Sequence, residues 1–160
     1  MSTALIVIDI QKDFCPRGAL AVPEGDLIVP EVNALMTQFD AVILTQDWHP
    51  AGHSSFASSH PGAAPMSLID MPYGPQVLWP DHCPAIDSYS AFFENDHTTP
   101  TGLEGYLKSR GITQLTMVGL ALDFCVNYSA VDAAQLGFSV TVRPDLCRAI
   151  DFDGSKARAL

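Results

Sequence analysis

The feature that most constrains the fold is a short apolar run near the N-terminus, residues 4–10, which reads Ala-Leu-Ile-Val-Ile-Asp-Ile. A continuous run of this length, rich in β-branched residues, is typical of a strand that is buried on both faces of a parallel sheet. Further apolar runs occur at 41–45, 114–120 and 138–143. We therefore expect residues 4–10 to form an inner strand of such a sheet.

Helical patterns separate these runs. Apolar residues recur at three- and four-residue steps over 27–39, as in an amphipathic helix. Residues 103–110 and 123–136 also have helical patterns, and each is followed by a glycine that ends it. Because strands that alternate with helices form parallel sheets with right-handed crossovers, the sequence predicts an α/β fold. The proline-rich stretch 47–82 has no periodicity, and its length suggests a functional loop.

Composition excludes several classes of function. The 160 residues, 48% hydrophobic and 16% charged, fit a single domain over residues 1–160. The net charge of -10 would repel the phosphate backbone of nucleic acid. No apolar run approaches the roughly 20 residues of a membrane helix, and the four cysteines show no disulfide spacing. We expect a cytoplasmic protein with neither a nucleic-acid nor a membrane partner.

Polar residues follow the apolar runs where a parallel sheet gathers its ligands, at the carboxyl ends of the strands. Asp9 is one of them, and an ionised carboxylate there needs a partner or a raised pKa. It is either a general acid or base, or the member of a helix cap or structural ion pair.

Cys125 lies two residues after Asp123, a candidate N-cap, in the first turn of the helix predicted over 123–136. Free N–H groups and the helix dipole at such a position favour a thiolate, which is the form of a cysteine nucleophile. The backbone N–H groups from Ala121 to Cys125 are also available as an oxyanion hole. The alternative is an inert cysteine in the core.

Aspartate and histidine gather in the loop that follows the second run. Asp47, His49, His53 and His82 offer the oxygen and imidazole ligands that bind Zn²⁺, Mn²⁺ or Fe²⁺. Histidines of a solvated loop are the alternative. Aromatic and apolar residues close to these groups in sequence would line a small flat pocket or belong to the core. They are Phe14, Leu20, Trp48, Trp79 and Tyr89.

Together these motifs resemble the isochorismatase-like cysteine hydrolases, and among them the nicotinamidases (pyrazinamidases), over nearly the whole chain. The pair Asp-x-His and Trp-Pro-x-His-Cys separates nicotinamidases from their metal-free relatives. The matching segments are residues 6–15, 18–23, 45–56, 78–83, 87–93 and 118–126.

The resemblance implies a three-layer α/β/α sandwich with a mostly parallel central sheet. It also implies hydrolysis of nicotinamide to nicotinate and ammonia, in NAD salvage, through a thioester on Cys125. Asp9 would be the proton shuttle, and the N–H groups of Ala121 and Cys125 would form the oxyanion hole. A cis peptide bond would precede Ala121.

The resemblance further implies a divalent metal ion, most simply zinc, with iron and manganese as options. Its ligands would be Asp47, His49 and His82, with His53 as a fourth or outer ligand. The substrate would contact Phe14, Leu20, Trp79 and Tyr89. A homo-oligomer is compatible with this family.

The sequence departs from the family in one respect. In the family, some dozens of residues separate Trp-Pro-x-His-Cys from Asp-Ser-Tyr-Ser and carry a lysine of the catalytic triad, whereas here Cys83 runs directly into Pro84. We interpret this as a segment missing at the 83/84 junction, and we expect residues to be missing at the C-terminal end as well. The alternatives are an inactive metal- and ligand-binding member and a metal-free isochorismatase-like hydrolase.

Overall fold

The computed structural model of this chain describes residues 2–83, 89–94 and 96–160. Its centre is a four-stranded sheet in the order β2-β1-β5-β6, in which every neighbouring pair of strands is parallel. Its strands are β1 (Ser2–Ile8), β2 (Ala41–Leu44), β5 (Ile112–Leu120) and β6 (Ser139–Arg148). The predicted α/β fold with a parallel sheet is thus confirmed.

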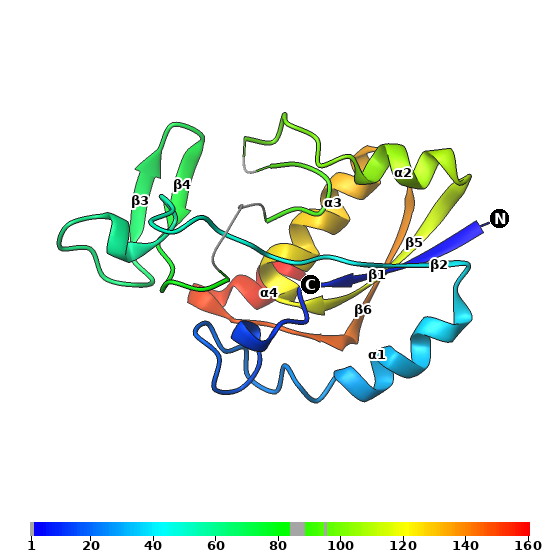
Figure 1. Cartoon of the computed structure of the whole chain (residues 1–160), viewed down its shortest axis with the longest axis horizontal. Helices are drawn as coiled ribbons and strands as arrows, with labels where there is room; N and C mark the ends of the chain where they lie inside the picture. Colours follow the sequence, from blue (N-terminus) through cyan, green and yellow to red (C-terminus); the bar gives the residue numbers. More distant parts are fainter. Residues whose placement is uncertain (1, 84–88, 95) are drawn as a thin grey trace.

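Helices cover both faces of the sheet, with α1 on one side and α2 and α3 on the other (Figure 1). The α-helices are α1 (Val29–Leu35), α2 (Leu103–Ser109), α3 (Asn127–Gln135) and α4 (Ser155–Ala159). Shorter helical turns are η1 (Lys12–Phe14), η2 (Met36–Gln38), η3 (Ala57–Ser59), η4 (Leu122–Val126) and η5 (Phe152–Gly154).

The side chains of β1 explain why there are three layers. Ala4, Ile6 and Ile8 belong to a buried cluster that includes Leu107 of α2 and Ala133 of α3. The alternate residues, Leu5 and Val7, belong to a second cluster together with Val32 of α1. Successive side chains of a strand point to opposite faces, so a strand without a polar face requires a helix layer on each side.

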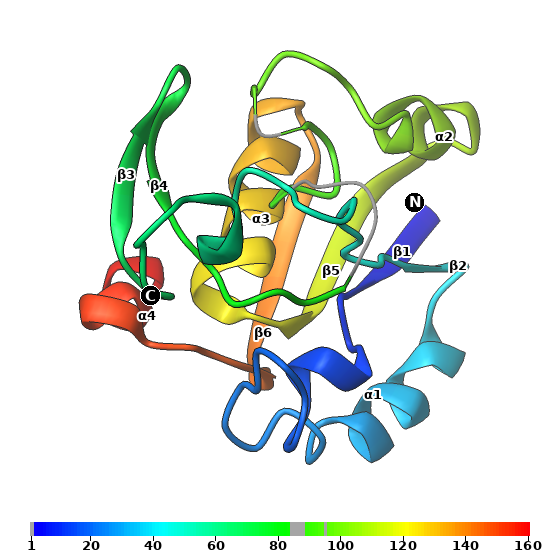
Figure 2. The same ribbon diagram turned by 60° about the vertical axis from the view of Figure 1, so that its left-hand side comes forward.

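The stretch 47–82, predicted to be without regular structure, contains an antiparallel hairpin of β3 (Leu68–Met71) and β4 (Gly74–Val77). The prediction was wrong here because the usual alternation is absent. Leu68 is exposed, Gln76 is buried and Pro75 lies within β4. Figure 2 shows this hairpin standing apart from the central sheet.

The remaining elements lie close to their predicted positions. The helix predicted over 123–136 consists of the π-helical turn η4 followed by α3, and β6 continues five residues beyond the predicted 143. Among the described residues, we find no helix with the length and apolar character that crossing a lipid bilayer requires. Because β1, β2 and β5 run parallel, the residues that follow Ile8, Leu44 and Leu120 emerge at the same edge of the sheet.

Candidate active site

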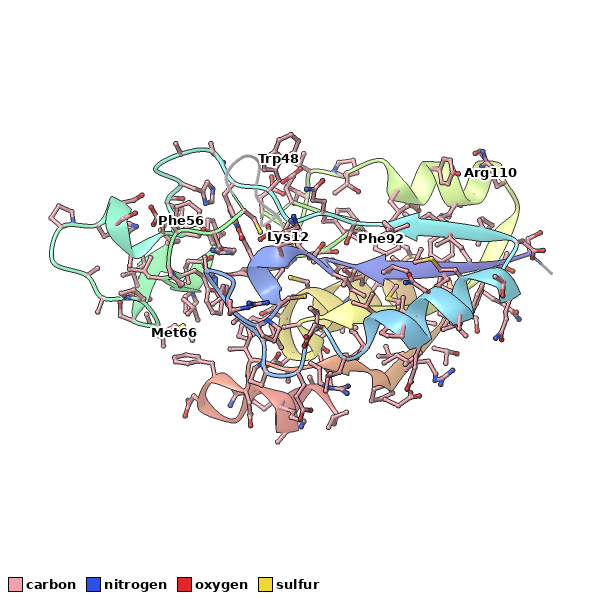
Figure 3. All side chains as sticks on the ribbon, turned by 60° about the horizontal axis from the view of Figure 1, so that its bottom comes forward. Lys12, Trp48, Phe56, Met66, Phe92 and Arg110 are labelled. Atoms are coloured by element: carbon pink, nitrogen blue, oxygen red, sulfur yellow. The ribbon has the colours of Figure 1, made fainter. Side chains whose placement is uncertain are left out.

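A cavity lies at this edge of the sheet. Its walls contain all four residues predicted to contact a substrate, together with Phe124 and Ile150, which the sequence did not indicate. Trp48 does not line it, since its side chain is 55% exposed and lies at the periphery of the molecule (Figure 3). The lining residues are Phe14, Leu20, Asp47, His49, Trp79, His82, Tyr89, Ala121, Phe124, Cys125 and Ile150.

Tyr89 and Trp79 are held against each other on one wall. The Trp79 indole N–H donates to the Tyr89 hydroxyl oxygen over 2.6 Å, and the Gln76 amide donates to the same oxygen at the same distance. The Trp79 ring meets the Phe124 ring edge to face, with 5.0 Å between centroids. Aromatic side chains restrained in this way give the cavity flat, apolar walls that suit a planar ring.

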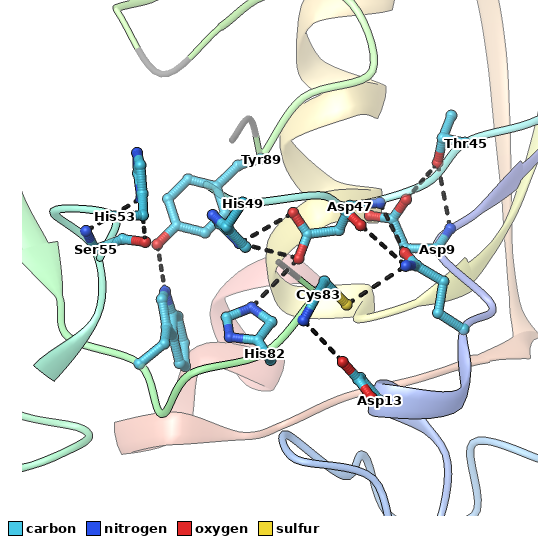
Figure 4. Close-up of polar contacts among 12 residues, drawn as sticks. Asp9, Asp13, Thr45, Asp47, His49, His53, Ser55, His82, Cys83 and Tyr89 are labelled. Atoms are coloured by element: carbon cyan, nitrogen blue, oxygen red, sulfur yellow. Dashed lines mark hydrogen bonds and ion pairs between the residues drawn. The ribbon is translucent and has the colours of Figure 1, made fainter. Parts of the chain in front are cut away.

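Asp9 lies next to Cys125, and both are buried. The Thr45 hydroxyl donates to Oδ1 of Asp9 over 2.6 Å, and the Asp9 backbone N–H donates to Thr45 Oγ1 over 3.2 Å (Figure 4). The Cys125 thiol also hydrogen-bonds the Asp9 carboxyl group. Thr45 is a site residue that the sequence did not indicate, although it lies only two positions before Asp47.

Burial sets the protonation of this pair. Loss of solvation raises the pKa of Asp9 from 3.8 to about 7, with a contribution from the negative charge of Asp47, while the Thr45 hydrogen bond opposes the rise. Burial also raises the pKa of Cys125, and the carboxyl groups of Asp9 and Asp47 raise it further. Asp9 and Cys125 therefore disfavour each other's ionisation, and a single proton shared between them satisfies both.

Cys125 is placed by the strand-to-helix junction. It lies within η4, which follows directly on β5, and Ala121 precedes that turn. The peptide bond before Ala121 is cis, as expected. The backbone N–H of Ala121 hydrogen-bonds the Cys125 sulfur, so at least one N–H group at this junction is directed at the nucleophile candidate.

Asp123 does not have the predicted role of helix N-cap. Ala121 occupies that position, without a side-chain cap. The buried carboxylate of Asp123 instead accepts hydrogen bonds from the backbone N–H groups of Ile150 and Asp151 and from the Ser155 hydroxyl. It ties the segment after β6 to the turn that carries Cys125.

A second polar group faces the same cavity. Asp47, His49 and His82 are buried, and their ligand atoms all lie within 4.8 Å of one another. Nε2 of His49 is 3.1 Å from Asp47 Oδ1, and Nε2 of His82 is 3.3 Å from Oδ2 (Figure 4). Although burial opposes it, the hydrogen bonds with both histidines lower the pKa of Asp47, so this carboxyl group is ionised.

The donor set fits a divalent metal ion. Nδ1 of His82 lies 2.7 Å from the carbonyl oxygen of Pro80. A carbonyl oxygen only accepts, so Nδ1 carries a proton and Nε2 is the ring nitrogen that faces Asp47. Nε2 of His82 and the Asp47 carboxylate are both electron-pair donors. At 3.3 Å they need a proton or a cation between them. One carboxylate and two imidazoles are ligands of the type that zinc, iron and manganese accept.

His53 lies beside this group without belonging to it. Its ring centroid is 5.2 Å from that of His49, and its Nδ1 accepts the Ser55 backbone N–H over 3.2 Å. The neutral ring therefore carries its proton on Nε2. A role for His53 as a fourth or outer ligand stays a prediction.

Lysine is missing from the walls of the cavity. The sequence has three lysines, and none lines the cavity among the described residues. Lys108 pairs with Glu104 on the exposed face of α2, while Lys12 and Lys156 are exposed. The predicted gap at the 83/84 junction involves Pro84, which lies outside the described residues.

Comparison with known proteins gives consistent matches. The isochorismatase domain family matches residues 3–160. The nicotinamidase of Acinetobacter baylyi is 48% identical over 98% of this chain and 86% of its own length. That match runs over 183 residues, more than the 160 of this chain, so the relative contains residues without a counterpart here.

Two solved structures extend the comparison. A nicotinamidase/pyrazinamidase of Acinetobacter baumanii superposes with a TM-score of 0.96 at 46% identity, covering 99% of this chain and 89% of its own. The pyrazinamidase of Pyrococcus horikoshii in complex with zinc has a TM-score of 0.72 at 32% identity, covering 99% of this chain and 92% of its own.

Proposed function

Because this chain belongs to the isochorismatase domain family, we propose that it is a nicotinamidase, which hydrolyses nicotinamide to nicotinate and ammonia. One observation carries the proposal. Cys125, which hydrogen-bonds Asp9, lines one small cavity with aromatic walls together with the Asp47, His49 and His82 group. The similarity to nicotinamidases over almost the entire chain supports it.

The reaction begins with the pair that shares a proton. The Cys125 thiol donates to Asp9, whose pKa of about 7 suits a group that takes up and returns a proton near neutral pH. As the sulfur attacks the carboxamide carbon, the thiol proton passes to Asp9 and the C–S bond forms. The carbonyl electron pair moves onto oxygen, where the N–H groups of Ala121 and Cys125 stabilise the negative charge.

Collapse of this tetrahedral species breaks the C–N bond. Asp9 returns its proton to the departing nitrogen, ammonia leaves and a thioester on Cys125 remains. Water then attacks the thioester while Asp9 takes a proton from it, and the Cys125 sulfur leaves as nicotinate forms. Thr45 keeps the Asp9 carboxyl group oriented through both halves of the reaction.

Asp47, His49 and His82 would hold the metal ion, and we propose zinc, with iron and manganese as ions that the same ligands accept. The zinc complex of the P. horikoshii relative supports this choice. A divalent ion supplies an electron-pair acceptor for the ring nitrogen of a pyridine carboxamide. Phe14, Leu20, Trp79 and Tyr89 would then enclose the ring.

Replacement of the nucleophile tests the proposal. Cys125→Ala abolishes ammonia release from nicotinamide and leaves bound metal unchanged, because the thiol is not a ligand of the metal group. Cys15→Ala, a partly buried cysteine outside the cavity, is the control and keeps its activity. Ammonia assay and plasma-emission metal analysis measure the two quantities, and ammonia release by Cys125→Ala at the unsubstituted rate would refute the role.

Replacement of a ligand tests the metal assignment separately. His49→Ala and His82→Ala lower both the metal content and the affinity for nicotinamide, whereas His97→Ala, outside the cavity, lowers neither. Equal metal content in all three variants would remove the metal from the proposal.

We also propose a cytoplasmic location, supported by four cysteines that are all free thiols. The missing-segment interpretation of the 83/84 junction remains a proposal, supported by the residues that the A. baylyi relative has in addition.

A further inference from the structure

The side-chain amide of Gln11 forms two hydrogen bonds with the backbone of Asp47. Its Oε1 accepts the Asp47 backbone N–H over 2.7 Å, and its Nε2 donates to the Asp47 backbone carbonyl over 2.9 Å. One planar amide thus occupies both hydrogen-bonding groups of one residue. The pairing fixes the position of the Asp47 backbone, and therefore the direction in which its carboxylate leaves the chain.

The same amide extends to the segment that carries His82. Nε2 of Gln11 lies 3.4 Å from Sγ of Cys83, the residue that follows His82. Gln11 thereby contacts both of the chain segments, 47–49 and 82–83, from which the metal group is assembled.

Asp13 holds the second segment from the other side. Its Oδ2 accepts the Cys83 backbone N–H over 2.7 Å (Figure 4), and the Cys83 carbonyl oxygen accepts the backbone N–H of His49. Cys83 has a φ of 39°, a left-handed conformation that a residue with a side chain adopts only where its surroundings hold it. The charged Asp13 acceptor is one such restraint.

We propose that Gln11 is a positioning residue for the metal ligands and that Asp13 assists it by holding Cys83. The segment after β1 then sets the affinity and the geometry of the metal site. The inference rests on the proposed function, because it takes Asp47, His49 and His82 as metal ligands. It adds a role for side chains that touch neither the metal ligands' donor atoms nor the cavity.

A physical reason links this contact to metal affinity. Ligand atoms must stand within a few tenths of an ångström of the distances that an ion requires, and groups that orient ligands typically change metal affinity by about 10- to 100-fold when they are removed. Asp47 and His49 lie on a connection after the edge strand β2, without a helix or strand of their own. The Gln11 amide supplies the restraint that regular structure would otherwise give.

The test compares two glutamines of one groove. Gln11→Met removes both hydrogen bonds while keeping the length of the side chain. Gln46→Met makes the same chemical change next to Asp47, at an exposed residue that lines the same groove as Gln11. Among the described residues, the Gln46 side-chain amide forms no hydrogen bond. Zinc affinity is measured by competition with a chromophoric chelator, and ligand geometry by the visible absorption of the cobalt-substituted protein.

We expect Gln11→Met to weaken zinc binding about 10- to 100-fold and to shift the cobalt spectrum, with Gln46→Met unchanged in both. Asp13→Asn weakens zinc binding in the same direction. A merely structural role would lower the thermal midpoint of the metal-free protein and leave both metal readouts unchanged, which would overturn the inference. If Gln11→Met does not fold, Gln11→Asn decides, because its side chain is too short to reach both backbone groups of Asp47.

Failure of the inference is distinguishable from failure of the proposed function. Equal zinc affinity of Gln11→Met and the unsubstituted protein overturns the positioning role alone. An unsubstituted protein that binds no zinc or cobalt overturns both the positioning role and the metal assignment, while ammonia release by the same sample reports on the amidase activity independently.

Discussion

At the scale of single residues, the candidate site is governed by the cost of burying charge. Asp9 is 4% exposed, its neighbour Asp47 is also negative, and the side chains that reach it are a hydroxyl and a thiol. The described residues that line the pocket beside Asp9 include no lysine or arginine, so protonation relieves the buried Asp9 carboxylate. The protonated Asp9 carboxyl group is able to exchange its proton with the Cys125 sulfur.

This burial predicts how stability depends on pH. The pKa of Asp9 is about 7 in the folded protein and 3.8 without the fold, so the folded state binds the proton more tightly. Its stabilising contribution is complete below pH 3.8 and is lost as pH rises to about 7. Between pH 5 and pH 8, the metal-free protein therefore loses about 2–3 kcal/mol of unfolding free energy relative to Asp9→Asn.

Urea denaturation of both proteins, with chelator present, measures the difference between them at each pH. Asparagine keeps the size of aspartate and its ability to accept the Thr45 hydrogen bond, so the difference isolates the charge. Parallel stability curves for the unsubstituted protein and the Asp9→Asn variant across this range would show that Asp9 ionises as readily in the fold as outside it.

At the scale of elements, the junction of β5 with η4 depends on a close contact between two strands. Gly119 pairs with Ile8, the residue that precedes Asp9, and has a φ of 127°. A Cβ atom at this position would lie only 2.0 Å from the Ile8 carbonyl oxygen. The close approach of β1 and β5 brings Asp9 and Cys125 together, and it requires glycine.

Gly119→Ala therefore lowers the unfolding free energy by several kcal/mol, because backbone rather than a flexible side chain meets the new methyl group. Gly105→Ala is the matched control. It lies within α2, no atom lies within 4 Å of its added Cβ, and alanine favours a helix over glycine by up to about 1 kcal/mol. Thermal unfolding separates the two, and equal midpoints would contradict the close-contact explanation.

A second element-level prediction concerns the segment after β6. The Asp123 carboxylate accepts three hydrogen bonds from this segment, which carries the cavity residue Ile150. Asp123→Ala leaves two backbone N–H groups without their acceptor and costs about 2–4 kcal/mol. The KM for nicotinamide rises as well, because Ile150 loses its support. Ser155→Ala removes one of the three bonds and has a smaller effect on both, as denaturation and steady-state kinetics would show.

At the scale of the whole molecule, the sequence predicted what depends on local pattern. The unbroken apolar run of β1 indicated the layered sheet, and the residues at its carboxyl end indicated the edge where the cavity lies. The hairpin β3–β4 was not predicted because its buried residue is the polar Gln76, while the apolar Leu68 is exposed. The roles of Thr45, Gln11 and Ile150 were not predicted, because they arise from contacts between segments that are distant in sequence, which no local pattern records.

The last prediction concerns the metal as a link across the molecule. Asp47 and His49 follow β2, whereas His82 follows the hairpin, so an ion held by all three joins segments more than thirty positions apart. An ion that binds only the folded chain stabilises it by about 4 kcal/mol at a free concentration of 1,000 times Kd, which corresponds to a rise of roughly 10 °C in Tm for a chain of this size. Adding chelator to the zinc-loaded protein therefore lowers Tm by about this amount, and His49→Ala, which lacks a ligand, shows little change. Because the expected difference lies between loaded and stripped samples of one protein, a Tm that chelator leaves unmoved would mean that these side chains hold no ion in solution.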